Sequence, residues 1–543
     1  MSVVPPVFFT VDHGTASTAA ALIVRVGERS RLVASGAQPA AIPIEPLLAR
    51  LADEVRDVDP ALLAAATQSP TAWRRVESAT RRPRWAVVCG ASTASMEAAE
   101  AAVASSGWRV VGRVGPERAQ AGLATEYCLD PDVELIVLAA LDPVAKDERE
   151  GLADLVSLIA AALGRRNQGV DVLLVGGAAS RASSLPGGRV VLGPAPSSDP
   201  DAAPDQLRDL LETMAVAPAE AASGASGPAD GRRALIASTR SLATRLDRRV
   251  ELVDIGAAAG VRALADPRRL IGSLMWADAA LVPPEVIDDD RRADQVLAWS
   301  TIRADQASLR DRVRNLALAP WRGVAGDGSR LRLAAARAAL TRLDAAWQLP
   351  DEDGRAANYG ADLLVASGGA FAVAPAPAVA MALLDTLRRP GAMALAVDHA
   401  RILGPLGGLE DADERGRLLD DLFEDALLPL GSVIVATGLR SGRHRDALRI
   451  TTNGGATSQV ELVPGGVQLV DLPPGVAGLA ELTTRDGAWV GVRSRSVAIS
   501  VAGGLGGLMI DTREYPLALP DRPERRRDLL DAWQRPLWPG AES

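Results

Sequence analysis

Short apolar runs alternate with amphipathic stretches over most of the chain, and this pattern predicts strands separated by helices. The first three apolar runs lie close together, at residues 7–12, 20–26 and 31–36, and a polar turn separates the first two. Further strands are expected at 85–90, 109–114, 134–141 and 171–177, and helices at 95–106 and 148–163. Strands that alternate with helices indicate an α/β layer with a largely parallel sheet.

The pattern restarts in the middle of the chain, which predicts a second lobe. A stretch rich in Pro, Ser, Gly and Ala at 194–232 has the composition of a connection between lobes. A strand and turn return at 250–260, another strand at 362–369, and the alternation continues to about residue 430. From 431 to 511, short β-branched runs separated by NGG, PGG, PPG and GGLGG turns favour a small all-β module.

We therefore expect several structural units rather than one. At 543 residues the chain exceeds the size at which a single hydrophobic core stops growing. The predicted units are a first α/β lobe at 1–240, a second α/β lobe at 241–430, a small β module at 431–520 and a C-terminal tail at 521–543.

Composition narrows the classes of partner. The net charge of −9 gives no basic excess with which to bind nucleic acid or an anionic membrane. The two cysteines, Cys89 and Cys128, fit neither a disulfide framework nor a zinc site, which favours a reducing compartment. No uncharged apolar run reaches the length of a membrane span. We expect a cytoplasmic protein that binds proteins or small ligands, and neither nucleic acid nor membranes.

The polar turn after the first strand has the residues of a phosphate site. Asp12 ends the strand, and Gly14, Thr15, Ser17 and Thr18 follow before the next apolar run. A tight hairpin of this kind points backbone N–H groups and hydroxyls at an anion, and an aspartate can hold a hydrated Mg²⁺. An ordinary polar β-turn can have the same residues, so this turn alone does not identify a nucleotide site.

Two later segments strengthen the nucleotide interpretation. Asp254 and Gly256 again place an acid and a glycine at the end of an apolar strand, about one lobe further along. Ser367, Gly368 and Gly369 end another strand, and paired glycines let a flat ring lie against the backbone. A duplicated fold that closes on one nucleotide needs two such acidic turns. We expect the two acids to face each other across one cleft, with the paired glycines at its rim.

The order of these motifs resembles the phosphate-1, phosphate-2 and adenosine motifs of the superfamily of actin, sugar kinases and heat-shock chaperones. Within it, the chain resembles the MutL/GlmL family of glutamate mutase accessory proteins, through the order of WAVVCGAS, ELIVLAAL, DVLLVGG and ILGPLGGL. This resemblance covers most of the first 430 residues. It implies the two-lobed actin-like (ribonuclease H-like) ATPase fold, an α/β fold that is followed here by the all-β module.

The resemblance also implies cofactors, a partner and residue roles. ATP and Mg²⁺ would lie between the lobes, and the protein would give chaperone-like, ATP-dependent help to a B12-dependent mutase, by reactivation or assembly. Asp12 and Asp254 would be the catalytic and metal-binding carboxylates. The remaining nucleotide contacts would come from Gly14, Thr15, Ser17, Thr18, Gly256, Ser367, Gly368 and Gly369.

The second turn departs from the family pattern and keeps another function open. After Gly256 the family has hydroxyl residues and an acid, whereas this chain has Ala257, Ala258 and Ala259. Hydroxyl donors to phosphate are missing there, so ATP hydrolysis is either weak or absent. The alternative to an ATP-dependent accessory protein is a degenerate pseudo-ATPase that acts as a scaffold or interaction protein. A small-molecule kinase has less support, because no general base is evident.

Overall fold

The computed structural model describes residues 7–58, 73–115, 121–146, 148–185, 189–195, 206–215, 228–322, 325–347, 360–372, 374–439 and 446–537. Its first lobe is built on β1 (Val7–His13), β2 (Ser17–Val26), β3 (Arg29–Pro39), β4 (Arg74–Ala79) and β10 (Ala229–Asp230). The first three strands form an antiparallel meander, β4 runs parallel to β1, and β10 runs parallel to β4.

Both faces of the first-lobe sheet are covered by helices, which explains why β1 and β2 are nearly continuous apolar runs. Phe9 and Leu22 pack under α1 (Glu45–Val58). Phe8 and Ile23, which point to the opposite face, belong to a core that includes α8 (Gly231–Leu246). The meander that carries the phosphate turn is therefore fixed from both sides.

The second lobe repeats this arrangement. β11 (Val250–Ile255), β12 (Gly260–Ala265) and β13 (Leu270–Trp276) form an antiparallel meander, β14 (Leu363–Ser367) is parallel to β11, and β15 (Gly391–Asp398) is parallel to β14. The order β13-β12-β11-β14-β15 corresponds strand by strand to β3-β2-β1-β4-β10 of the first lobe. This duplicated topology is that of the two-lobed actin-like fold, and it confirms the predicted fold class.

Helices close the outer face of the second lobe and fill the space between the lobes. α9 (Asp290–Leu297), α10 (Gln306–Leu318), α11 (Asp327–Ala346) and α12 (Ala376–Leu387) share a core with one face of its sheet. On the other face, α8 is joined by α13 (Leu403–Gly407) and α14 (Ala412–Ala426) in a core that also contains residues of the first-lobe sheet. The chain thus returns from β15 to the first lobe.

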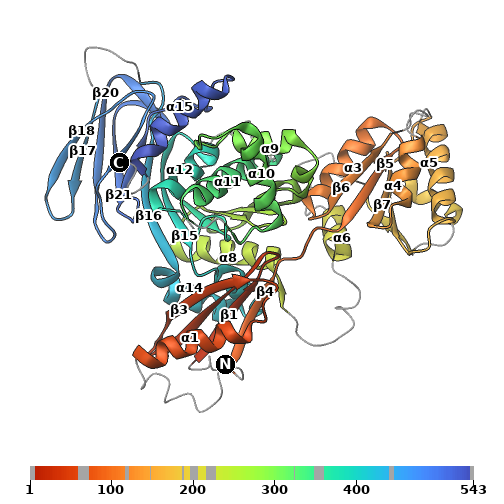
Figure 1. Ribbon diagram of the computed structural model, residues 1–543, viewed down its shortest axis with the longest axis horizontal. Helices are drawn as coiled ribbons and strands as arrows, with labels where there is room; N and C mark the ends of the chain where they lie inside the picture. Colours follow the sequence, from red (N-terminus) through yellow and green to blue (C-terminus); the bar gives the residue numbers. More distant parts are fainter. Residues whose placement is uncertain are drawn as a thin grey trace.

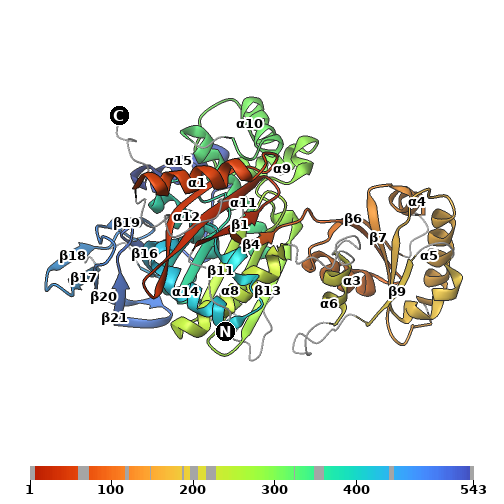
Figure 2. The ribbon, with the colours of Figure 1, turned by 90° about the horizontal axis from the view of Figure 1, so that it is seen from below.

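A separate parallel sheet is inserted between β4 and β10. It comprises β5 (Trp85–Gly90), β6 (Arg109–Val114), β7 (Val133–Ala140), β8 (Asp171–Gly176) and β9 (Arg189–Gly193), in the order β6-β5-β7-β8-β9. One face packs on α3 (Thr93–Ser105) and α6 (Gln206–Ala215), the other on α4 (Ala121–Leu129) and α5 (Glu148–Leu163). Figures 1 and 2 show this unit projecting from one side of the two lobes. Arg109 pairs with Glu285, which attaches the inserted unit to the second lobe.

The C-terminal region is rich in β-structure, as predicted. β16 (Leu427–Val435), β22 (Leu508–Asp511) and β19 (Val467–Val470) extend the second-lobe sheet beyond β15. β17 (Ala447–Thr452), β18 (Thr457–Glu461), β20 (Ala477–Val490) and β21 (Val492–Ala502) form a separate antiparallel sheet, and α15 (Pro523–Gln534) follows. In Figure 1 this sheet lies at the opposite end of the molecule from the inserted unit.

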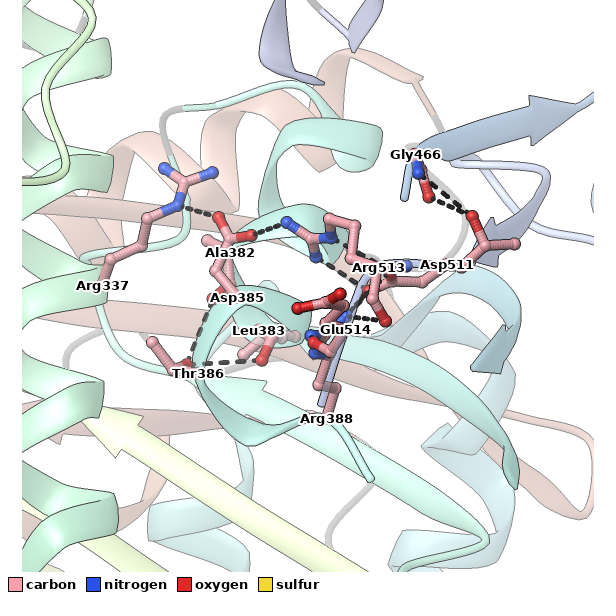
Figure 3. A network of polar contacts seen from close by, with 11 residues as sticks. Arg337, Ala382, Leu383, Asp385, Thr386, Arg388, Gly466, Asp511, Arg513 and Glu514 are labelled. Atoms are coloured by element: carbon pink, nitrogen blue, oxygen red, sulfur yellow. Dashed lines mark hydrogen bonds and ion pairs between the residues drawn. The ribbon is translucent and has the colours of Figure 1, made fainter. Parts of the chain in front are cut away.

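A buried ionic network ties the end of β22 to the second-lobe helices (Figure 3). Asp385 on α12 accepts from Nε of Arg337 and Nη1 of Arg513, both at 2.6 Å. Asp511 accepts from Nη2 of Arg513 at 2.8 Å and from Nη1 of Arg388 at 2.9 Å. None of these five side chains is more than 2% exposed. Because two carboxylates serve three guanidinium groups, every carboxylate here is needed.

The range 1–240, treated as one lobe in the sequence analysis, contains both the first-lobe sheet and the inserted sheet. Much of the connecting stretch at 194–232 lies outside the described residues. The unit boundaries at 240, 430 and 520 therefore stay a proposal. Among the helices that the structure describes, none is both long and apolar enough to cross a membrane.

Candidate functional site

The two acidic turns have the same backbone construction. In the first, the Gly14 N–H donates to the Ser17 carbonyl at 3.1 Å, and in the second the Gly256 N–H donates to the Ala259 carbonyl at 3.0 Å. Each turn joins the first two strands of its meander, and each follows an aspartate near the end of the first strand. The two lobes thus present equivalent turns, of which the first has hydroxyl side chains and the second has alanines.

Both turns line one cavity of about 360 Å³, together with the end of β14. That volume lies within the range of small-molecule pockets, about 300–1,000 Å³. Gly368 has φ +91°, and a Cβ there would come within 2.7 Å of the Ile255 carbonyl oxygen, so only glycine fits this close approach. Trp321, whose side chain is 44% exposed, and Pro320 add an apolar wall. The cavity therefore combines a polar end with an apolar end.

Arg401 lies against the first turn from the other side of the cleft. It follows β15, and its guanidinium reaches across to β1, where Nε donates to Asp12 Oδ2 at 2.7 Å. Nη2 lies 2.5 Å from the same oxygen, and Nη1 donates to Ser17 Oγ at 2.8 Å. The other oxygen of Asp12 accepts from Ser78 Oγ at 3.1 Å. Both oxygens of the first acid are therefore engaged by the protein.

Two further carboxyl groups near Arg401 have perturbed acidity. Burial and the charge of Asp12 raise the pKa of Asp254 to about 6. Burial also raises the pKa of Asp398 to about 7. The Leu403 and Ile402 N–H groups donate to this carboxyl at 3.1 and 3.0 Å, and these hydrogen bonds lower the pKa by less than burial raises it. Burial lowers the pKa of the Arg401 guanidinium, but the negative charges nearby, chiefly those of Asp12 and Asp254, have the larger combined effect and raise this pKa. Arg401 is thus paired with one carboxylate, Asp12, and lies near two carboxyl groups that hold their protons more tightly than exposed ones do.

The raised pKa of Asp254 predicts a pH-dependent gain in stability for Asp254→Asn. A carboxyl that titrates near 6 in the folded protein and near 3.9 in the unfolded chain binds its proton more tightly when folded. Ionisation of this carboxyl therefore lowers the free energy of unfolding. The full loss applies above about pH 7, and it disappears as the pH falls toward 4. We expect Asp254→Asn to raise the free energy of unfolding by about 1–2 kcal/mol at pH 8, and by roughly half as much at pH 5.

Urea unfolding of wild type and Asp254→Asn at the two pH values measures this difference. Asp528→Asn, at a carboxylate that is 68% exposed, is the matched control and should show no such pH dependence. A stability change of the Asp254 variant that is equal at pH 5 and pH 8 would show that this carboxyl is not perturbed.

The structure brings nearly all the predicted site residues together. Those that line the cavity are Asp12, Gly14, Thr15, Ser17, Asp254, Gly256, Ser367, Gly368 and Gly369. Thr18 is buried in β2 and does not line it. His13, between Asp12 and Gly14, lies with Nε2 3.5 Å from Glu77. The structure thus places these residues around one cavity, whereas their roles in binding a nucleotide and a metal stay a prediction.

Sequence reasoning missed the two residues that most affect the electrostatics of the cleft, Asp398 and Arg401. An acid at the end of the apolar run GAMALAVD is the same signal that singled out Asp12 and Asp254. It could have drawn attention to the following residues, which precede the ILGPLGGL element. Nothing in the sequence indicates that Arg401 contacts a residue 389 positions earlier.

The arrangement around Asp12 does not fit a divalent cation. Mg²⁺ is usually bound through one or two carboxylates and retained waters, whereas Asp12 Oδ2 already faces the Arg401 guanidinium, whose charge repels a cation, and Oδ1 accepts from Ser78. In the described part of the chain, no group of three or more His, Cys, Asp or Glu side chains is placed to hold a metal. The role of metal ligand predicted for Asp12 and Asp254 gains no support from this geometry.

Comparisons with known proteins give only distant likenesses. No protein-family model matches the chain, and no curated protein matches it. Among solved structures, it is similar to the activator of 2-hydroxyisocaproyl-CoA dehydratase from Clostridium difficile with bound ADPNP, at 10% identity over 77% of this chain and 98% of that chain, with a TM-score of 0.26.

Two further solved structures show likenesses of the same kind. Component A of (R)-2-hydroxyglutaryl-CoA dehydratase from Acidaminococcus fermentans matches at 10% identity over 75% of this chain and 98% of that chain, with a TM-score of 0.26. An exopolyphosphatase from Cytophaga hutchinsonii matches at 8% identity over 67% of each chain, with a TM-score of 0.18. Likenesses with TM-scores this low carry no information on the function of this chain.

Proposed function

We propose that this chain is a nucleotide-binding accessory protein that holds ATP in the cleft between its lobes. The observation that carries the proposal is the convergence of two equivalent acid–glycine turns and a glycine-lined strand end on one cavity. Thr15 and Ser17 face the polar end, where phosphates would lie. Trp321 and the backbone at Gly368 and Gly369 line the part that would take a flat base.

The partner that we propose is a protein, and the sequence resemblance favours a B12-dependent mutase. Lobe closure on the nucleotide would change the relative positions of the units that each lobe carries. The inserted sheet contacts the second lobe through Arg109 and Glu285, and the C-terminal sheet leads directly into β22 of the second-lobe sheet, where Asp511 pairs with Arg388. Both units would therefore follow the second lobe in such a movement.

A scaffold without turnover is the second candidate, and two observations favour it. Ala257, Ala258 and Ala259 give the second turn no hydroxyl group, although its backbone matches that of the first turn. Arg401 occupies the carboxylate of Asp12. Phosphoryl transfer depends on positioned donors, and loss of one such donor typically costs about 10²–10³ in rate. We therefore expect binding of ATP with little or no hydrolysis.

Separate measurements of binding and turnover test the proposed function. Calorimetry should detect ATP binding to the full chain, whereas phosphate release under saturating ATP should be far slower than in an active chaperone of this fold. Robust release that Asp12→Ala abolishes would favour the ATP-dependent accessory protein over the scaffold. Absence of ATP binding under all conditions would refute a nucleotide function and leave a protein-interaction role.

A further inference from the structure

Arg401 has an unusual backbone conformation. Its φ of +54° lies in the left-handed region, which non-glycine residues adopt at a cost and which often marks a functional position. Its side chain is only 11% exposed, yet it lines the cavity. A backbone conformation that is costly for a non-glycine residue therefore accompanies the placement of this guanidinium group beside the first turn.

The guanidinium still has a donor to offer. It carries five N–H groups. Nε is engaged by Asp12, one N–H of Nη1 by Ser17 Oγ, and Nη2 by the Ser17 carbonyl and Asp12. At least one N–H of Nη1 therefore remains for a group in the cavity. A guanidinium N–H forms a strong, charge-assisted hydrogen bond with a phosphate oxygen, so a phosphate placed beside Ser17 could accept one such bond.

Arg401 is the cavity-lining arginine that contacts the first turn directly, through Asp12 and Ser17. The other arginine that lines the cavity, Arg332, is 4% exposed; its Nη2 donates to the Arg322 carbonyl, and its buried Nε has no hydrogen-bond partner. The Arg401 guanidinium stays protonated beside Asp12 and Asp254, and unlike a bound metal ion it cannot be removed by a chelator. A fixed cation beside Asp12 offsets the charge of that carboxylate, which would otherwise repel a phosphate group at the first turn.

We propose that Arg401 takes the place of a divalent cation, so that the cleft binds the phosphate chain of a nucleotide without metal. This inference rests on the proposed nucleotide function and adds to it the chemistry of recognition. It follows from the occupied carboxylate of Asp12, the free donor of Arg401 and the position of both at the cavity wall.

The test measures ATP binding to the full chain in EDTA and in excess Mg²⁺. Wild type is expected to bind ATP with dissociation constants that agree within about threefold in the two buffers. Arg401→Ala removes the cation and frees Asp12, so its affinity in EDTA should fall by about 10- to 100-fold, the effect of one hydrogen bond to a charged group. Mg²⁺ should then restore part of the lost affinity. Arg401→Lys, which keeps the charge, should lose less than Arg401→Ala in EDTA.

The control is Arg303→Ala, which removes an exposed guanidinium paired with Asp528 away from the cleft and should leave binding unchanged. Thermal unfolding of each variant checks that it is folded. Wild-type binding that requires Mg²⁺ would overturn this inference and leave the proposed function standing. A folded Arg401→Ala that binds ATP like wild type in EDTA would also overturn it, because Arg401 would then only brace the lobes. Absence of ATP binding in both buffers would overturn the inference and the proposed function together.

Discussion

Replacement of Asp511 with alanine is expected to lower the free energy of unfolding by about 3–5 kcal/mol. The Asp511 side chain is fully buried and accepts hydrogen bonds from Arg388 and Arg513 (Figure 3). Its removal leaves Asp385 as the one carboxylate for the three guanidinium groups of the network. A buried charge without a partner has lost its hydration and has no ion pair to offset that cost, so the expected loss of stability is large. Urea denaturation of the full chain measures it.

The matched control for this prediction is Asp528→Ala. Asp528 pairs with Arg303 at 3.1 Å, but both side chains are 68% exposed, so solvent screens the pair. Its removal should cost less than about 1 kcal/mol. Similar losses for the two variants, or a loss below about 1 kcal/mol at Asp511, would mean that the buried network does not hold the end of β22 to the second-lobe helices.

Local patterns predicted the parts of the structure that depend on neighbouring residues. The first meander, with Asp12 at the end of its first strand, is visible as apolar runs around a polar turn, and the same signal marks Asp254. The spacing of apolar residues and the residue types of a turn depend on neighbouring positions, so both can be read from a single sequence. Gly368 was likewise singled out from the sequence, as one of two paired glycines at the end of a strand, and its positive φ and close backbone contact show why other residues do not fit there.

Contacts between distant segments could not be predicted in the same way. Arg401 is separated from Asp12 by 389 residues, and Arg388 is separated from Asp511 by 123. An arginine after a strand has the same appearance in the sequence whether it faces solvent or a carboxylate. For the same reason four strands of the inserted sheet, between residues 85 and 177, could be recognised, but β9 and the separation of these strands into an inserted sheet could not. Strand type is a local property, whereas sheet membership depends on packing.

The central claim is that ATP binds between the two acidic turns, and a bulky side chain at Gly369 tests it most directly. A Cβ at this position would meet only Ser17 Oγ, at 3.7 Å, which is an ordinary contact, and Gly369 lines the cavity. Gly369→Val should therefore fill the cleft without disturbing the fold. Gly169→Val is the matched control, because a Cβ at Gly169 has no atom within 4 Å and the residue lies outside the cleft.

Calorimetric titration of ATP into wild type, Gly369→Val and Gly169→Val gives the answer. We expect Gly369→Val to weaken binding at least about 100-fold, which corresponds to about 2.7 kcal/mol, because the valine occupies the volume that the ligand needs. Its unfolding temperature should stay close to that of wild type, and Gly169→Val should bind as wild type does. A folded Gly369→Val that binds ATP with wild-type affinity would place the nucleotide outside this cleft and contradict the account.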